Sequence, residues 1–328
     1  MTTPTPVNEF MLNIEKSLKE RDLAEGTVKF YLKTLYMLND RKPFKSLAFL
    51  KKKDDIAGKL EKYAESSQKT ILGAICSVLS PYKERGPYKK TYEYYCQLVK
   101  EKNGVAPETP AGEKTERERE SWITWEDVQK RRNELRESVS GIGKTATADQ
   151  FNELLNYVVL SLYTLIQPRR NQDYMDMVVV KKWTESMPTD KNYLDMNGGK
   201  KPTQFVFNKY KTAKTHGQQK FSIPDELAEV LTKYITHHPL RPKGRPKEYS
   251  FPLLVSAAGE PLTSVNAITR ILNHIFKKKI GSSMLRHIFL SNKYDLSEMK
   301  EDAEAMGHTV GTQRNYLRTE PEGGEPKI

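Results

Sequence analysis

Cysteine is scarce in this sequence, since Cys76 and Cys96 are the only two among 328 residues. They are far from any metal-ligand spacing, and so few thiols suit a reducing compartment and no structural disulfide. Residues 1–10 lack the basic and apolar regions of a signal peptide. The longest nearly apolar run, residues 157–166, is too short to span a bilayer. The sequence therefore predicts an intracellular protein with no membrane segment.

Cofactor-binding motifs are also missing. The chain has no glycine-rich P-loop, no cluster of Cys and His, and no spaced set of carboxylates, which are the patterns that indicate a nucleotide cofactor or a metal. Positive charge, in contrast, is abundant: 54 Lys and Arg against 42 Asp and Glu give a net charge of +12. This excess favours nucleic acid as partner, although a solvated basic surface accounts for it about as well.

Short amphipathic helices are predicted throughout residues 1–102. In one of them Val28, Tyr31, Leu32 and Leu35 recur at i, i+3, i+4 and i+7, which is the apolar stripe of a helix. The predicted helices are residues 10–20, 26–38, 52–64, 67–82 and 89–102. They indicate a small all-α domain.

Lysines leave parts of this domain basic. A solvated face explains them as well as DNA does, but they are candidate DNA contacts; the three selected are Lys29, Lys33 and Lys69. Residues 103–120 then combine Pro, Gly and dense charge with almost no apolar side chains, so they are predicted to be a linker.

Residues 121–328 are predicted to form a second domain that is mainly helical and contains one small antiparallel sheet, an α+β fold. The predicted helices are residues 122–135, 149–166, 225–238, 263–276, 283–294 and 296–306. Strand-like runs at 177–183, 203–214 and 219–224 supply the sheet, and a glycine between the last two suits a hairpin turn.

Several side chains of the second domain are suited to binding a phosphate. Arg169 and Arg170 follow a buried helix, and Asp173 is spaced to orient Arg170, although an exposed ion pair is the simpler interpretation. Arg286 interrupts an otherwise apolar helix and needs a partner or the surface. His287 beside it is more typical of a structural histidine.

The last third of the chain also holds candidate acid and nucleophile groups. Lys211 and Lys214 end the first strand of the predicted hairpin and could protonate a leaving oxygen. His308 could donate to a phosphate oxygen, and Tyr316 could attack the phosphorus. A tyrosine hydroxyl normally has a pKa near 10, so such a role needs positive charge nearby, which two arginines would provide.

The order of these motifs resembles the tyrosine recombinase, or phage-type integrase, family over most of the chain. The resemblance implies an N-terminal helical core-binding (SAM-like) domain at 1–102, a linker at 103–120 and a catalytic domain at 121–328. It implies that the catalytic residues are Arg170, Lys211 (or Lys214), Arg286, His308 and Tyr316, with Asp173 following the first arginine. Lys211 is slightly preferred as the acid.

Two departures from the family pattern stand out. Ser283 occupies the position three residues before Arg286 where the family usually has a histidine, and Tyr316 follows His308 by eight residues, one fewer than in many bacterial and phage members. Other stretches, at 251–276 and 278–294, look more like recombinases of large eukaryotic DNA viruses and their mobile elements.

The function implied by the resemblance is site-specific DNA recombination or integration through a 3′-phosphotyrosyl bond, without metal or cofactor. It implies double-stranded DNA as partner, a DNA-dependent tetramer, and a location with that DNA, in a host nucleus or at a site of viral replication. A type IB topoisomerase shares the chemistry. A non-catalytic DNA-binding descendant of a recombinase is the other alternative, kept open by Ser283, and a plain basic structural protein leaves the motif order unexplained.

Overall fold

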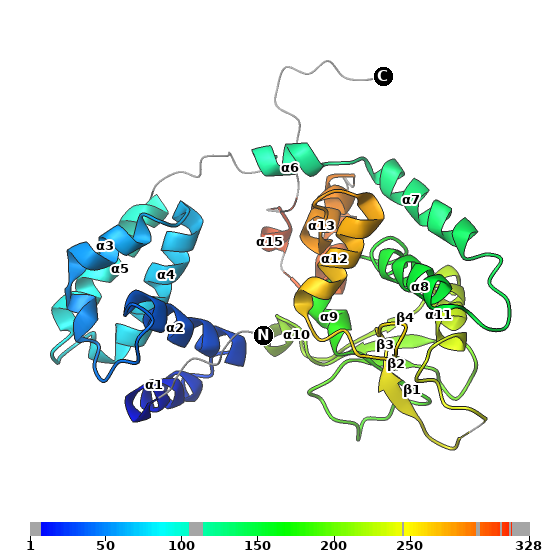
Figure 1. Ribbon diagram of the computed structural model, residues 1–328, viewed down its shortest axis with the longest axis horizontal. Coiled ribbons are helices and arrows are strands. Elements are labelled where there is room, and N and C mark those ends of the chain that lie inside the picture. Colours follow the sequence, from blue (N-terminus) through cyan, green and yellow to red (C-terminus); the bar gives the residue numbers. More distant parts are fainter. Residues whose placement is uncertain are drawn as a thin grey trace, which may run out of the picture. The chain divides into compact units, whose positions relative to one another are not determined.

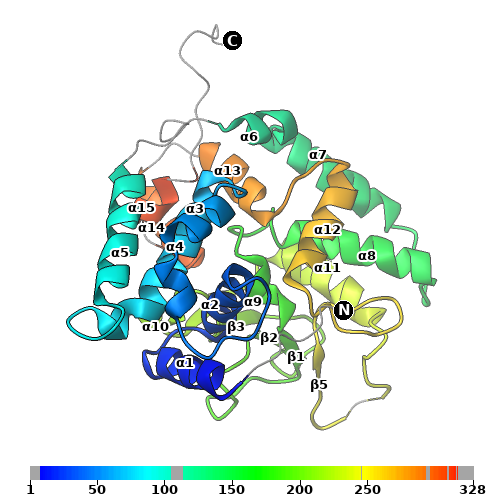
Figure 2. The same ribbon diagram turned by 60° about the vertical axis from the view of Figure 1, so that its left-hand side comes forward.

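The computed structural model describes residues 8–104, 114–244, 246–292, 296–308, 310–314 and 316. The chain divides into two compact units, Met1–Glu108 and Thr109–Ile328, shown in Figures 1 and 2. Each unit has its own hydrophobic core. No helix within the described ranges is long and apolar enough to cross a bilayer.

The N-terminal unit contains the helices expected from the sequence. They are α1 (Glu9–Glu20), α2 (Glu25–Leu38), α3 (Lys53–Leu60), α4 (Glu65–Leu79) and α5 (Lys89–Gly104), with short 3-10 turns at Ala48–Lys51 and Ser80–Tyr82. The stripe of α2 is directed inward, since Val28 and Leu35 are buried. Cys76 and Cys96 are both free thiols.

The lysines selected as DNA contacts lie on the surface of α2 and α4. Lys29 pairs with Glu25 at 2.6 Å and Lys69 with Glu65 at 3.3 Å, each one helical turn apart, and Lys33 is exposed. Such pairs at the surface contribute little to stability. A role in DNA binding therefore stays a prediction for all three.

The C-terminal unit is mainly helical with one sheet. Its helices are α6 (Glu116–Ser121), α7 (Trp125–Ser138), α8 (Ala148–Ser161), α9 (Asn171–Met175), α10 (Ala213–His216), α11 (Asp225–Thr236), α12 (Val265–Phe276), α13 (Ser282–Ser291), α14 (Leu296–Ala305) and α15 (Val310–Arg314). α8 lies at the centre: Leu154, Val158 and Val159 are fully buried in the core of this unit. The loop that follows α8 leads directly to the paired arginines.

The sheet is mixed, which corrects the prediction of an antiparallel sheet. Its strands are β1 (Val178–Val180), β2 (Tyr193–Asp195), β3 (Gln204–Phe207), β4 (Gln219–Ser222) and β5 (Ser250–Pro252), in the order β4-β3-β2-β1-β5. β1 and β2 are parallel, whereas the other neighbours are antiparallel. The predicted hairpin is present as β3 and β4, but β3 ends at Phe207, before both candidate lysines.

The segment predicted as a linker is partly helical. α6 begins with a capping box in which Thr115 and Glu118 each accept a hydrogen bond from the other's backbone N–H. The Glu118 carboxylate also lies 2.5 Å from His287 Nδ1 on α13. The segment was predicted as a linker because it has almost no apolar residues. Polar contacts, namely the capping box and the Glu118–His287 pair, stabilise α6 instead. Residues 105–113 of the predicted linker lie outside the described residues.

His238 is predicted to make the stability of the C-terminal unit depend on pH. It is buried beside the rings of Tyr234 and Phe251, and its Nδ1 accepts a hydrogen bond from Leu240 N. Burial lowers the pKa of His238 to about 4, below the ordinary 6.5. Because the unfolded chain binds the proton more tightly, stability should fall as pH drops from 7 to 5, by about 2 kcal/mol.

Urea unfolding at pH 7 and pH 5 tests this expectation. His238→Leu should remove that part of the pH dependence, whereas His237→Leu, a change at the partly exposed neighbour, should retain most of it. An unchanged pH dependence in His238→Leu would assign the effect to other groups.

Candidate functional site

Two adjacent arginines at the start of α9 have different environments. Arg169 is 2% exposed, and its Nε donates to the Asp173 carboxylate at 2.8 Å. Arg170, the N-cap residue of α9, has extended backbone and is only partly buried. Its Nη1 lies 3.5 Å from the carbonyl oxygen of Gly307. Arg170 is therefore the member of the pair that remains available to a ligand.

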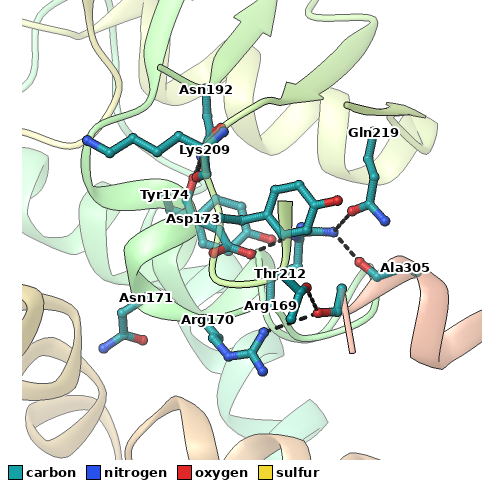
Figure 3. A network of polar contacts seen from close by, with 12 residues as sticks. Arg169, Arg170, Asn171, Asp173, Tyr174, Asn192, Lys209, Thr212, Gln219 and Ala305 are labelled. Carbon is teal, nitrogen blue, oxygen red and sulfur yellow. Dashed lines mark hydrogen bonds and ion pairs between the residues drawn. The ribbon is translucent and has the colours of Figure 1, made fainter. Parts of the chain in front are cut away.

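The expected partnership between Asp173 and Arg170 is corrected by this geometry, because the ion pair joins Asp173 to Arg169 (Figure 3). Asp173 is fully buried, and burial raises its pKa while Arg169 works against that rise. The carboxylate balances the buried charge of Arg169. In the described structure the guanidinium of Arg170 forms no ion pair.

Arg286 and Tyr316 are in direct contact. Nη2 of Arg286 donates to the Tyr316 hydroxyl at 2.8 Å, and the guanidinium carbon lies 4.5 Å from the centre of the tyrosine ring. Tyr316 thus reaches the second candidate arginine of its own chain despite the short step from His308. Within the described residues, Nε and Nη1 of Arg286 are buried and have no hydrogen-bond partner.

Positive charge concentrates around this contact. Arg286 is 4% exposed, and burial lowers the pKa of its guanidinium, with the nearby charge of Arg170 acting in the same direction. A buried guanidinium with unused N–H groups is stabilised by an anion, and its planar geometry suits two phosphate oxygens. The arrangement is therefore suited to binding a phosphodiester.

His308 also lies close to Tyr316. It is buried, and its ring centre is 5.3 Å from that of Tyr316. The preceding Gly307 has a positive φ of 69°, a left-handed conformation that glycine adopts at little cost. The turn at Gly307 brings His308 and Tyr316 to the same place as the two arginines.

Lys211 and Lys214 lie in the connection between β3 and β4, in or beside the short helix α10, and both are exposed. Thr212 lies between them, and its hydroxyl donates to the Gly307 carbonyl. The lysine-bearing connection is thus attached to the segment that carries His308. Neither lysine is distinguished by this geometry, so the preference for Lys211 stays a prediction.

The two remaining candidates, both on α13, differ in environment. His287 pairs with Glu118 and its ring centre is 5.0 Å from that of Tyr316, which fits the structural interpretation and adds a support for the tyrosine ring. Ser283 is exposed in the first turn of α13. In the described part of the chain it makes no hydrogen bond to Arg286, His308 or Tyr316.

Sequence reasoning missed two residues of this region. Gln219 accepts from Arg169 Nη1 at 3.0 Å and donates to the carbonyl of Glu304 at 2.9 Å, and Thr212 binds Gly307. A glutamine in a strand and a threonine between lysines carry no signal of their role in the sequence, because their partners are distant along the chain.

Two cavities of the described structure lie outside the group formed by Arg170, Arg286, His308 and Tyr316. A cavity of about 330 Å³ is lined by Arg169, Ala305 and several phenylalanines, and a second, of about 440 Å³, includes Lys181 and Tyr249. Neither is lined by Arg170, Arg286, His308 or Tyr316. Among the described residues, no three His, Cys, Asp or Glu side chains are grouped so that they could hold a metal ion.

Comparison with solved structures gives a distant likeness in fold. No protein-family model and no curated protein matches the sequence. The structure is similar to one described as the crystal structure of XerA recombinase, with 14% sequence identity and a TM-score of 0.37, over 96% of this chain and 94% of that chain. At this distance the likeness supports no statement about the site, whose interpretation depends on the chain's own residues.

Proposed function

We propose that this protein is a DNA strand transferase of the tyrosine recombinase type, with Tyr316 as nucleophile. In the proposed step, the Tyr316 oxygen attacks a DNA phosphorus, a 3′-phosphotyrosyl bond forms, and the bond to the 5′ oxygen breaks. The phenol loses one proton and the 5′ oxygen gains one. Attack by a 5′-hydroxyl on the phosphotyrosine reverses the step and joins strands without an added energy source.

The contact between Arg286 and Tyr316 carries this proposal. A buried guanidinium that donates to a phenol at 2.8 Å lowers the cost of forming the phenolate, and its unused N–H groups can bind the phosphate that the phenolate attacks. Arg170 and His308 supply further donors to the non-bridging oxygens. In comparable sites each such donor contributes about 3 kcal/mol to the stability of the transition state.

The wider features of the proposal rest on the sequence resemblance. They are double-stranded DNA as substrate, DNA binding by the basic surface of the N-terminal unit, four copies at a synapse, and a location with the DNA of a mobile element, which the resemblance links to eukaryotic viruses. Backbone contacts would supply most of the affinity, so binding should weaken steeply with salt.

Covalent trapping tests the proposal directly. The substrates are nicked duplexes whose sequences together cover the DNA that flanks the gene. After cleavage, the short strand beyond the nick dissociates and cannot be rejoined. A covalent complex that resists denaturant should therefore accumulate. Digestion and mass spectrometry should locate the nucleotide on the peptide that contains Tyr316. An adduct on another residue would contradict the assignment, and DNA binding without any adduct would favour the non-catalytic alternative. Relaxation of supercoiled plasmid without a specific site would favour the topoisomerase.

The leaving-group acid can be identified by chemical rescue. Lys211→Ala or Lys214→Ala, whichever removes the acid, should slow cleavage by about a hundredfold or more, because the 5′ oxygen leaves poorly without a proton. A substrate with sulfur at the 5′-bridging position needs no acid and should restore the rate of that variant only. The two variants are matched controls for each other, and failure to rescue either would place the acid on another residue.

A further inference from the structure

The C-terminal end of α14 is held by side chains from distant parts of the C-terminal unit (Figure 3). The last carbonyls of a helix have no partner within the helix and need one elsewhere. Here the carbonyl of Glu304 accepts from Gln219 Nε2 at 2.9 Å, and the carbonyl of Ala305 accepts from Arg169 Nη1. Gln219 on β4 and Arg169, just before α9, therefore donate hydrogen bonds to the last carbonyls of α14; the Glu304 carbonyl also accepts from Gly307 N at 3.0 Å.

Arg169 is held by contacts through its Nε, its Nη1 and the face of its guanidinium. Its Nε binds Asp173, its Nη1 binds Gln219 at 3.0 Å, and its guanidinium carbon lies 4.0 Å from the centre of the Phe207 ring. A cation is also favoured at a helix C-terminus by the helix dipole. The ion pair with Asp173 offsets much of the cost of burying this charge, so the guanidinium forms a rigid support for Ala305.

The next residues of the chain are packed against the same support. A Cβ at Gly307 would lie 3.0 Å from the Tyr210 ring and 3.4 Å from Arg169 Nη2, so a side chain would press on both neighbours as well as strain the left-handed backbone. Beyond it, the amide of His308 donates to the carbonyl of Ala303 at 3.0 Å. The position of His308, and of Tyr316 after it, thus depends on how the end of α14 is anchored.

We infer that Arg169 and Gln219 are positioning residues, which anchor the end of α14 and thereby hold His308 and Tyr316 against Arg286. Both are at least nine-tenths buried, and in the described structure neither contacts Tyr316, so they act through the backbone of residues 304–308. The anchoring itself is independent of any reaction. Its consequence for catalysis rests on the proposed function.

Hydrogen exchange of the free protein measures the anchoring without DNA. Gln219→Leu preserves size but removes both hydrogen bonds, so the amides of α14, His308 and Tyr316 should exchange roughly tenfold faster. Gln218→Leu is the matched control, because this exposed neighbour bonds Asn208 instead, at 2.7 Å, and it should leave these amides unchanged. Equal exchange in both variants would overturn the inference, as would a Gln219→Leu protein whose amides lose protection throughout the unit.

Cleavage kinetics separate positioning from substrate binding. With a nicked duplex at saturating concentration, Gln219→Leu should form the covalent complex roughly tenfold more slowly than Gln218→Leu, with the same affinity for the duplex. Faster exchange with an unchanged cleavage rate would overturn the positioning role. If the exchange results hold but the wild-type protein cleaves no duplex, the proposed function fails and the anchoring of His308 and Tyr316 stands.

Discussion

Tyr316→Phe is expected to abolish the covalent complex with nicked DNA while changing affinity for the duplex by less than about twofold. The substitution removes the attacking oxygen and leaves the ring, whose centre lies 5.0 Å from that of His287 and 5.3 Å from that of His308. Affinity for DNA comes mainly from cations that contact phosphates, and the phenol is neutral before reaction. Gel separation under denaturing conditions measures the adduct, and fluorescence anisotropy measures binding.

A second tyrosine of the C-terminal unit provides the control for this experiment. Tyr249 is partly buried and stacks on Phe251, with ring centres 5.8 Å apart, so Tyr249→Phe should leave trapping intact. Trapping that persists in Tyr316→Phe would assign the nucleophile to another residue. Loss of both trapping and binding would instead indicate that the tyrosine ring supports the structure of the DNA-binding surface.

The helices of the N-terminal unit were predictable because their apolar residues recur at the spacing of a helix, so the buried face can be identified from neighbouring residues alone. Val28 and Leu35 are on one face of α2, and both are buried. The sheet was harder to predict. β2 and β5 span three residues each, Tyr193–Asp195 and Ser250–Pro252, which is too short for an alternating pattern to be recognised. The parallel pairing of β1 with β2 joins segments whose relation depends on the intervening chain, so the sequence of either strand does not reveal it.

The candidate site was predictable as a set of residues but not as a set of contacts. Arg170, Arg286, His308 and Tyr316 were selected from the order of motifs, and the structure brings them together. The ion pair of Asp173 was assigned to the wrong arginine. Two adjacent side chains point in different directions when the backbone between them is extended, as at the N-cap of α9, and local sequence does not determine which one is buried. Gln219 was missed because its partners are at 169 and 304.

Arg286→Ala is expected to lower the rate of covalent complex formation at saturating DNA by about a thousandfold, the effect of removing one preorganised donor to a developing anion. Arg286 also donates to the Tyr316 hydroxyl, so its loss removes a contact to the nucleophile as well as one to the phosphate. Arg286→Lys should recover only part of the rate, because a single ammonium cannot match the planar fork that reaches both groups. Single-turnover cleavage of a nicked duplex measures these rates.

Arg170→Ala is the informative comparison for Arg286, because it removes a second guanidinium from the same site without disturbing the contact to Tyr316. Among the described residues, its half-buried side chain makes one hydrogen bond, a long one of 3.5 Å to the Gly307 carbonyl, so its loss should mainly affect phosphate binding. If the proposal is right, raising the pH should recover more of the rate in Arg286→Ala than in Arg170→Ala, since hydroxide can then form the phenolate that Arg286 otherwise favours. The same recovery in both variants would mean that Arg286 acts on the phosphate only, and that its bond to Tyr316 has no part in activating the nucleophile.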